Sequence, residues 1–272
     1  MAGAQENKRA TRWLRWLRGG KSDLGADVTQ VTESARRARS GKLVPVPLLV
    51  QRIARALTQQ PSAYALWVVF LLMVFRQLTG LHAVVFYTVE IFEDAKSVVP
   101  APYAAIIIGV VEVIATYLAS VLVDRWGRRF LLLTSAVGTT ACHASLAMYY
   151  AFLHHGYDLD DFSWLPLLFI ALFIVNCACG FGPLPWFMMA ELTPTEHKNW
   201  AAGMTGFLNW GSMFLVLKLF PTLTTYLGEY VAFAIFSLNC LLASFFVFFW
   251  VPETKGKTLE EIQNEIAESR GH

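Results

Sequence analysis

The sequence predicts an all-α integral membrane protein, with six transmembrane helices that follow a polar, helical N-terminal segment. Of its 272 residues, 56% are hydrophobic and only 15% are charged, which is typical of membrane proteins and not of soluble domains. The apolar residues gather in six stretches, each long enough for the roughly 20 residues that cross a bilayer as a helix. We expect the spans at 62–92, 101–123, 130–153, 163–191, 201–227 and 230–251.

Lys and Arg residues are distributed unevenly between the two sides of these spans. Twelve of the 22 lie in the segment 1–61, and most of the others lie in the links and the tail that fall on the same side. The positive-inside rule therefore places the linker 1–61 and the tail 252–272 in the cytosol, on either side of a bundle formed by 62–251. We expect a multi-pass protein of the plasma membrane with both termini cytosolic.

The linker 1–61 contains an amphipathic pattern that predicts a helix. Within 12–18, two tryptophans and a leucine share one helical face and three arginines lie on another. Such a helix rests on the membrane interface or packs beneath the bundle. We expect further helices at 25–40 and 45–58, which would make the whole segment a cytosolic helical linker.

The first two spans each carry a charged side chain near the bilayer centre. Arg76 and Glu112 lie about 16–18 Å into their spans at the helical rise. An arginine at this depth costs about 2.5–3.5 kcal/mol on insertion scales, so it indicates either a functional site or a buried ion pair that fixes helix packing. We predict that Arg76 and Glu112 pair with each other.

Two further polar residues of the first span surround a glycine. Gln77 and His82 are five residues apart and would not share one face of a straight helix. We expect Gly80 to break the helix, so that both side chains reach a common cavity. His82 is equally consistent with a hydrogen-bonded core histidine, and His143 in the third span is more typical of a structural residue.

The fourth span has no charged side chain before Glu191, yet it is interrupted inside. In hydrocarbon, a helix break is tolerated only where it is buried in protein or lines a watery cavity. We therefore expect a moving or cavity-lining helix, with its flexibility at Gly180, Gly182, Pro183 and Pro185.

An aromatic and an amide at membrane depth are compatible with a sugar site. Trp186 follows the break in the fourth span, and Asn209 lies in the fifth. Sugars have polar rims and apolar C–H faces, so a flat aromatic ring beside amide groups can bind them. Packing and hydrogen bonding between helices would explain either residue equally well.

Charged residues gather at the cytosolic ends of several spans. The short link between the second and third spans contains four of them, Glu191 closes the broken span, and an acidic residue follows the last span. Opposite charges in such a place can latch helices in one state and release them in another, whereas the simpler reading is a topology signal. The expected network comprises Asp124, Arg125, Arg128, Arg129, Glu191 and Glu253.

Several function classes find no support in the sequence. No nucleotide-binding loop and no H-E-x-x-H signature is present. The residues 154–161 combine two histidines with three aspartates, but a solvated acidic loop explains them better than a metal site. We expect no enzyme activity, no cofactor, no metal and no nucleic-acid partner.

Four motifs occur in a fixed order along the chain: Gln77-Leu78-Thr79-Gly80, Asp124–Arg129, Gly182–Glu191 and Pro252–Lys257. Together they resemble those of the sugar porters in the major facilitator superfamily, and the chain looks most similar to facilitated trehalose transporters. The resemblance implies spans seven to twelve of a twelve-helix carrier, preceded by the linker between its two halves. Such carriers work by alternating access around a central site, so a missing N-terminal six-span half becomes an expected partner, beside the sugar and the lipid bilayer.

The resemblance also implies which residues meet the sugar. Gln77, Trp186 and Asn209 match sugar-contacting positions of the family, whereas Arg76, His82 and Glu112 stand where the family usually has Gln, Asn and Asn. These replacements change charge and hydrogen-bonding capacity together, because Arg only donates and an ionised Glu only accepts.

The function expected from all these features is transmembrane transport of trehalose or a hexose-type sugar by alternating access, as a fragment or truncated form of a full carrier. The alternative is a transport-inactive membrane protein with a ligand-binding or regulatory role. A six-span channel rests on the number of spans alone.

Overall fold

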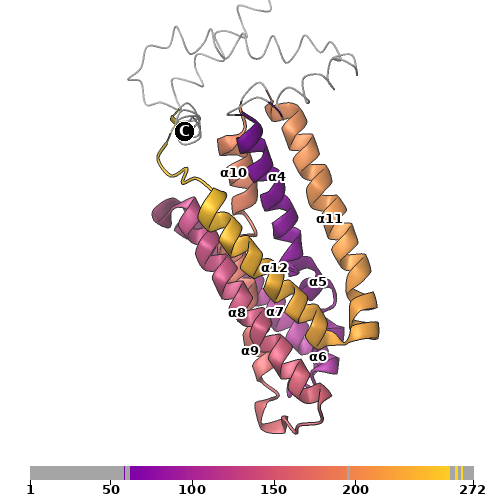
Figure 1. Cartoon of the computed structure of the whole chain (residues 1–272). Coiled ribbons are helices and arrows are strands. Elements are labelled where there is room, and N and C mark those ends of the chain that lie inside the picture. The colour runs from indigo at the N-terminus through magenta and orange to yellow at the C-terminus, as the bar shows by residue number, and fades with distance from the viewer. Residues whose placement is uncertain (1–57, 59–61, 195–196, 258–260, 263–264, 266–272) are drawn as a thin grey trace, which may run out of the picture. The chain divides into compact units, whose positions relative to one another are not determined.

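The computed structural model describes residues 58, 62–194, 197–257, 261–262 and 265. This part of the chain is helical and contains no strand, which confirms the predicted all-α class. The helices expected at 12–18, 25–40 and 45–58 fall outside the described residues, except for Thr58. With the labels of Figure 1, the helices are α4 (Ser62–Leu78), α5 (Leu81–Phe86), α6 (Thr88–Asp94), α7 (Ala101–Trp126), α8 (Arg128–His154), α9 (Leu165–Cys179), α10 (Leu184–Leu192), α11 (Lys198–Leu227) and α12 (Glu229–Trp250), with a 3-10 turn at Asp160–Phe162.

Five helical segments of the described chain are long and apolar enough to cross a membrane. They are Ser62–Phe86, Ala101–Val121, Arg128–His154, Asp160–Leu192 and Glu229–Trp250. The helix at the fifth expected span, α11, has 30 residues and is also long enough, but it is less apolar. Lys198, Asn209 and Lys218 lie along it and lower its hydropathy.

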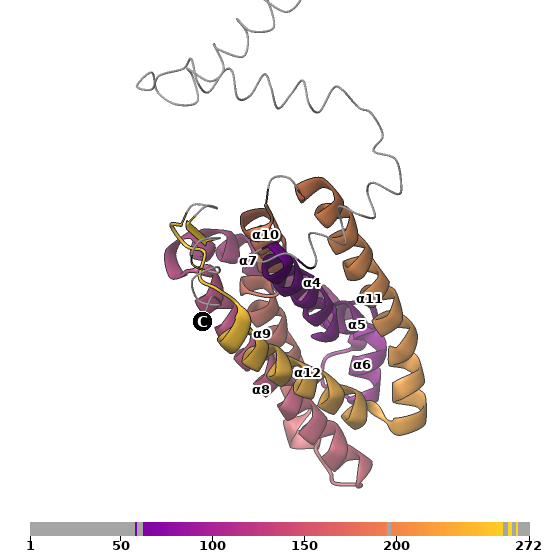
Figure 2. The same ribbon diagram turned by 45° about the horizontal axis from the view of Figure 1, so that its top comes forward.

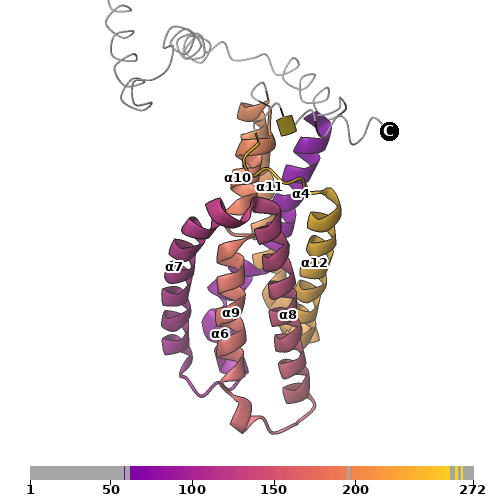
Figure 3. The same cartoon turned by 90° about the vertical axis from the view of Figure 1, so that its left-hand side faces the viewer.

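The helices pack as neighbours that are distant in sequence. α8 and α12 lie side by side, and α9 lies between α7 and α8 (Figure 3). α4 packs against α10 and α11, which brings the start of the bundle beside its second half (Figure 2). α11 therefore packs against α4 and α5 as well as α10, and α8 packs against both α9 and α10.

Buried apolar side chains form two clusters along the bundle. One contains Leu66, Leu132 and Leu184 and joins α4 to α8 and α10. The other is richer in aromatic side chains, with Phe173 and Phe233 among its fully buried residues. Because lipid tails are as apolar as these side chains, close packing and hydrogen bonds between helices hold such a bundle together more than exclusion of water does.

The first helix break lies where the sequence predicts it. α4 ends at Leu78, and Gly80 adopts a left-handed conformation with φ 78° before α5 begins. A Cβ atom at Gly80 would lie 2.7 Å from the ring of Phe236, so the close approach of α12 also requires glycine here. The break therefore combines a backbone turn with a tight helix contact.

The second break spans residues 180–183, between α9 and α10. The carbonyl of Cys177 accepts hydrogen bonds from Gly180 N (3.2 Å) and Gly182 N (2.7 Å), which closes a tight turn. Pro185 lies in the first turn of α10, where its missing N–H has no helical partner to lose. Of the four residues expected to interrupt this span, three lie in the break and Pro185 lies in the helix after it.

Candidate functional site

Arg76 connects the two helix breaks through its guanidinium group. Its Nε donates a hydrogen bond to the carbonyl of Gly182 at 2.9 Å, and its Nη1 donates to Oδ1 of Asn209 at 2.9 Å. Gln77 donates to the same oxygen of Asn209 at 2.7 Å. One amide on α11 and one carbonyl in the second break thus fix the polar end of α4.

A cavity of about 310 Å³ opens beside this group. Arg76, His82 and Glu112, three of the predicted site residues, line it together although they come from α4, α5 and α7. Gly182 and Pro183 contribute the wall from the second break. The other lining residues are Leu81, Val85, Thr116, Ile174 and Ala178.

The remaining predicted sugar contacts lie elsewhere. Gln77 and Asn209 are almost fully buried and do not line the cavity. Asn209 instead accepts hydrogen bonds from both Arg76 and Gln77. Trp186 lies on α10, half-buried and also outside the lining. Buried polar atoms of Gln77 (Oε1) and of His82 (Nδ1) have no hydrogen-bond partner within the described residues.

The ion pair predicted between Arg76 and Glu112 is not formed. Both residues line the cavity, but no salt bridge joins them in the described part of the chain. Arg76 donates instead to two neutral oxygens within hydrogen-bond distance, the Gly182 carbonyl that the second break leaves free and the Asn209 amide on α11.

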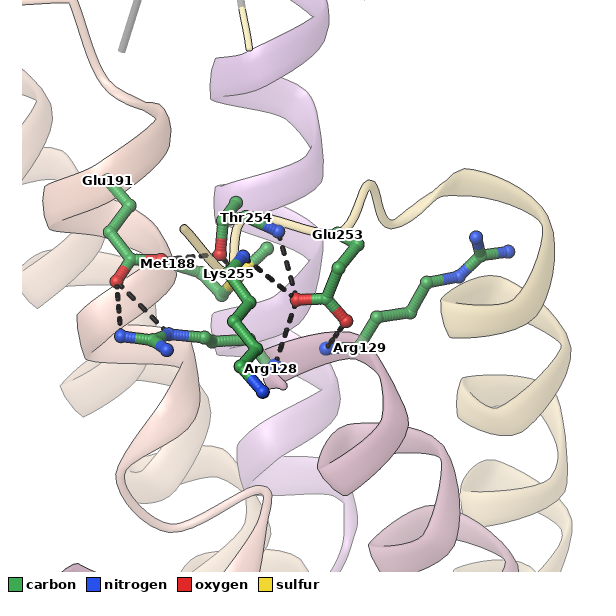
Figure 4. A network of polar contacts seen from close by, with 7 residues as sticks. All are labelled: Arg128, Arg129, Met188, Glu191, Glu253, Thr254 and Lys255. Carbon is green, nitrogen blue, oxygen red and sulfur yellow. Dashed lines mark hydrogen bonds and ion pairs between the residues drawn. The ribbon is translucent and has the colours of Figure 1, made fainter. Parts of the chain in front are cut away.

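The predicted charge network gathers at the ends of α8, α10 and α12 (Figure 4). Arg128 binds Glu191 through Nε and Nη2, both at 3.2 Å from the same carboxylate oxygen. The hydroxyl of Thr254 donates to the other oxygen of Glu191. Both carboxylate oxygens of Glu191 are therefore engaged, one by α8 and one by the segment after α12.

Glu253 caps the N-terminus of α8. Its Oε1 accepts the backbone N–H of Arg128 at 3.0 Å, and its Oε2 accepts that of Arg129 at 3.2 Å. A carboxylate satisfies these free N–H groups and interacts favourably with the positive end of the helix dipole. The approach needs Gly127, where φ is 88° and a Cβ would lie 2.9 Å from Glu253 Oε2.

The other predicted members of the network differ in their roles. The exposed Arg125 takes part through its carbonyl, which accepts from Nζ of Lys255 at 2.6 Å. Arg129 donates to the carbonyl of Phe248 and lies 6.0 Å from the centre of its ring, so it ties α8 to α12. The side chain of Asp124 lies outside the described part of the chain.

Sequence reasoning missed several residues of this network. Gly127, Thr254 and Lys255 all contribute, and Gly127 does so by the absence of a side chain. Their signal was available, since Gly127 lies inside the basic link and the other two follow Glu253 directly. A backbone carbonyl such as that of Gly182, in contrast, carries no signal in a sequence.

Comparisons with known proteins agree with this architecture. Among curated proteins, the chain is 34% identical over 261 residues to "Facilitated trehalose transporter Tret1-2 homolog" of Drosophila sechellia, covering 96% of this chain and 52% of the relative. It is 36% identical over 262 residues to "Facilitated trehalose transporter Tret1" of Anopheles gambiae, covering 95% of this chain and 32% of the relative. The chain thus spans about half, or less, of the length of these relatives.

Solved structures show the same relationship in three dimensions. The chain resembles the proton:xylose symporter XylE bound to 6-bromo-6-deoxy-D-glucose, with a TM-score of 0.69 and 25% identity, covering 95% of this chain and 51% of that one. The inward-open conformation of XylE from E. coli gives a TM-score of 0.64 at 23% identity and covers 50% of that chain. The fold is therefore that of one half of a major facilitator transporter.

The family model described as "Sugar (and other) transporter" matches residues 1–266. This match covers nearly the whole chain and includes the cavity, both helix breaks and the charge network. The family assignment predicted from the four motifs is confirmed, and the chain belongs to the sugar transporter family of the major facilitator superfamily.

Proposed function

We propose that this chain provides the cavity and one gate of a carrier for trehalose or a hexose-type sugar. The observation that carries the proposal is the cavity at the meeting of two broken helices, lined by Arg76, His82 and Glu112. Donors of the guanidinium and acceptors of the carboxylate suit the hydroxyl groups of a sugar, and Leu81 and Ile174 supply apolar wall for its C–H faces. The names of the curated relatives favour trehalose.

The carrier would be completed by a second six-helix half. The chain corresponds to about half of its relatives and of XylE, and alternating access needs two bundles that rock around a shared site. Large apolar side chains on α7, among them Val113 and Tyr117, are exposed and could contact lipid or such a partner.

The charge network would form the cytosolic gate. The concentration of Lys and Arg on one side supports a cytosolic position for the ends of α8, α10 and α12 and for both termini. Arg128, Glu191 and Glu253 would hold these ends together in one state and separate in the other. We assign the carrier to the plasma membrane.

The test is sugar binding and uptake by purified protein. The chain would be reconstituted into liposomes, alone and together with the N-terminal half of a curated relative, and uptake of radiolabelled trehalose and glucose would be measured. We expect saturable uptake only in the combined sample, and weaker sugar binding when Glu112 is replaced by Leu. Binding of neither sugar by either sample would overturn the proposal and favour the transport-inactive alternative.

A further inference from the structure

Helix α8 contacts both helix breaks of the bundle from a single side. Nε2 of His143 lies 2.9 Å from the carbonyl oxygen of Thr79, in the first break. Eight residues earlier, Oγ of Ser135 accepts the backbone N–H of Phe181 at 3.3 Å, in the second break. Eight residues are about two helical turns, so both contacts come from the same broad face of α8.

The bond from His143 serves a carbonyl that the first break has released. Gly80 adopts a left-handed conformation. Among the described turn and loop residues, no backbone N–H donates to the carbonyl oxygen of Thr79. A carbonyl only accepts hydrogen bonds, so Nε2 of His143 carries the proton and donates. An unpaired carbonyl at this depth would be costly, and His143 removes that cost.

The ring of His143 lies in an aromatic pocket where the bond to Thr79 is its one polar contact among the described residues. It is fully buried, and its centroid lies 4.4 Å from that of Phe173, 5.6 Å from Phe236 and 5.8 Å from Phe233. Nδ1 has no partner among the described residues. A phenylalanine would fill this aromatic pocket without an unpaired nitrogen, so the bond to Thr79 is what favours histidine here.

The second break is held by close packing as well as by a hydrogen bond. Ser135 is almost fully buried, and a Cβ atom at Gly180 would lie 2.2 Å from the Cβ of Ser135. α8 therefore fits directly against the turn that separates α9 from α10. Any change in that turn has to displace α8 or break the bond to Phe181.

The two breaks are also bonded to each other. Arg76, one turn before Gly80, donates to the carbonyl of Gly182 at 2.9 Å. Together with the two contacts from α8, this bond closes a loop through three segments. Such a contiguous network with tight packing is the kind of element that carries coupling between distant positions.

We propose that α8 couples the two helix breaks, with His143 and Ser135 as positioning residues that keep the α4–α5 and α9–α10 segments in one joint arrangement. The two segments then rearrange together and not one at a time. The use of this coupling in transport rests on the proposed function, but the coupling itself can be measured without any sugar.

The test follows backbone hydrogen exchange by mass spectrometry on the full chain in detergent micelles, at residues 80–87 and 180–187. His143→Phe removes the donor and keeps an aromatic ring, whereas His143→Gln keeps a side-chain N–H donor. For His143→Phe we expect exchange to rise about five- to tenfold in both segments, as expected from the loss of one buried hydrogen bond. His143→Gln should restore slow exchange in both.

Ser135→Ala provides the reciprocal experiment and carries the test if His143→Phe does not fold. It should speed exchange at 80–87, although Ser135 contacts only the other break. Ser145→Ala is the control, because among the described residues this hydroxyl bonds only to the carbonyl of Ala141 in α8 itself, and it should change neither segment. Faster exchange confined to the break that each variant touches would overturn the coupling, as would no change in either segment. Absence of sugar uptake would leave it intact.

Discussion

Glu253 and Arg128 are 125 residues apart in sequence, yet a carboxylate oxygen of Glu253 accepts the backbone N–H of Arg128 at 3.0 Å. This bond joins the segment after α12 to the first residue of α8, and a second oxygen of the same carboxylate reaches Arg129. The segment after α12 therefore stabilises the N-terminus of α8, the third span, and its removal should destabilise that helix.

The first prediction concerns this helix cap. Glu253→Ala should lower the free energy of unfolding by about 1–2 kcal/mol, because two backbone N–H groups lose their acceptor at the positive end of α8. Glu253→Gln should lose less, since an amide oxygen still accepts one bond. Denaturant unfolding in detergent measures both. If both variants lost the same free energy of unfolding, the stabilisation would come from the charge of Glu253 and not from its hydrogen bonds to the helix N-terminus.

The second prediction concerns the glycine that admits this carboxylate. Gly127→Ala should destabilise the fold by about 1–3 kcal/mol, since its backbone conformation, φ 88° and ψ 148°, is almost restricted to glycine and the new methyl group would meet Glu253. Gly203→Ala is the matched control, because no described atom outside the adjoining backbone of α11 lies within 4 Å of its Cβ position. The control should be neutral or more stable than the parent chain. A harmless Gly127→Ala would contradict the geometry.

The third prediction concerns the shared amide behind the cavity. Asn209→Ala should cost about 1–3 kcal/mol in stability, because Arg76 and Gln77 both lose the oxygen to which they donate. Asn209→Asp keeps that oxygen and adds a charge opposite Arg76, so it should retain most of the stability. Thermal unfolding of the purified variants compares them, and an Asp variant weaker than the Ala variant would refute this role.

The fourth prediction concerns the gate. Glu191→Gln removes the charge that binds Arg128 but leaves an oxygen for the hydroxyl of Thr254. Because the Arg128–Glu191 pair is partly exposed, stability should fall by less than about 1 kcal/mol. The sugar uptake rate should change clearly although the free energy of unfolding falls only slightly. Uptake rate and sugar affinity, both measured in reconstituted liposomes, separate an effect on gating from an effect on binding. Unchanged uptake in Glu191→Gln would argue against a latch.

The fifth prediction concerns pH at the opposite end of the bundle. Partial desolvation, followed by the nearby charges of Glu229, Glu90 and Glu93, raises the pKa of Asp94 above its usual value. The folded state therefore holds this proton more tightly, and stability falls as pH rises through the interval between the unfolded and folded pKa values. Asp94→Asn should slightly raise the melting temperature at pH 7, and the gain should vanish in acid, where Asp94 is protonated in both states.

The sequence was informative about the elements whose signals are local. Long apolar runs gave the helices to within a few residues, and Gly80 and the Gly180–Pro185 run located both breaks. The same local reading assigned Pro185 to the break, whereas it lies in the first turn of α10, where proline is well tolerated. Charges in the links located the network but not the pairs within it.

Pairing is where the sequence reasoning failed, and Arg76 shows why. Opposite charge and similar depth favour Glu112 as its partner, yet two neutral oxygens bind it instead. One of them is a backbone carbonyl freed by a turn, and every residue has a carbonyl. Its availability depends on the local backbone conformation and on which helix comes to lie beside it.

The sequence by itself determined that this is a helical membrane protein of the sugar transporter family, because hydropathy, helix breakers and ordered motifs act over short distances along the chain. Only the tertiary structure decided that Arg76, His82 and Glu112 share one cavity while Gln77 and Asn209 lie behind it. It also decided that α8 contacts both breaks through His143 and Ser135. These facts depend on how helices pack against one another, and packing is set by the fit of many side chains at once.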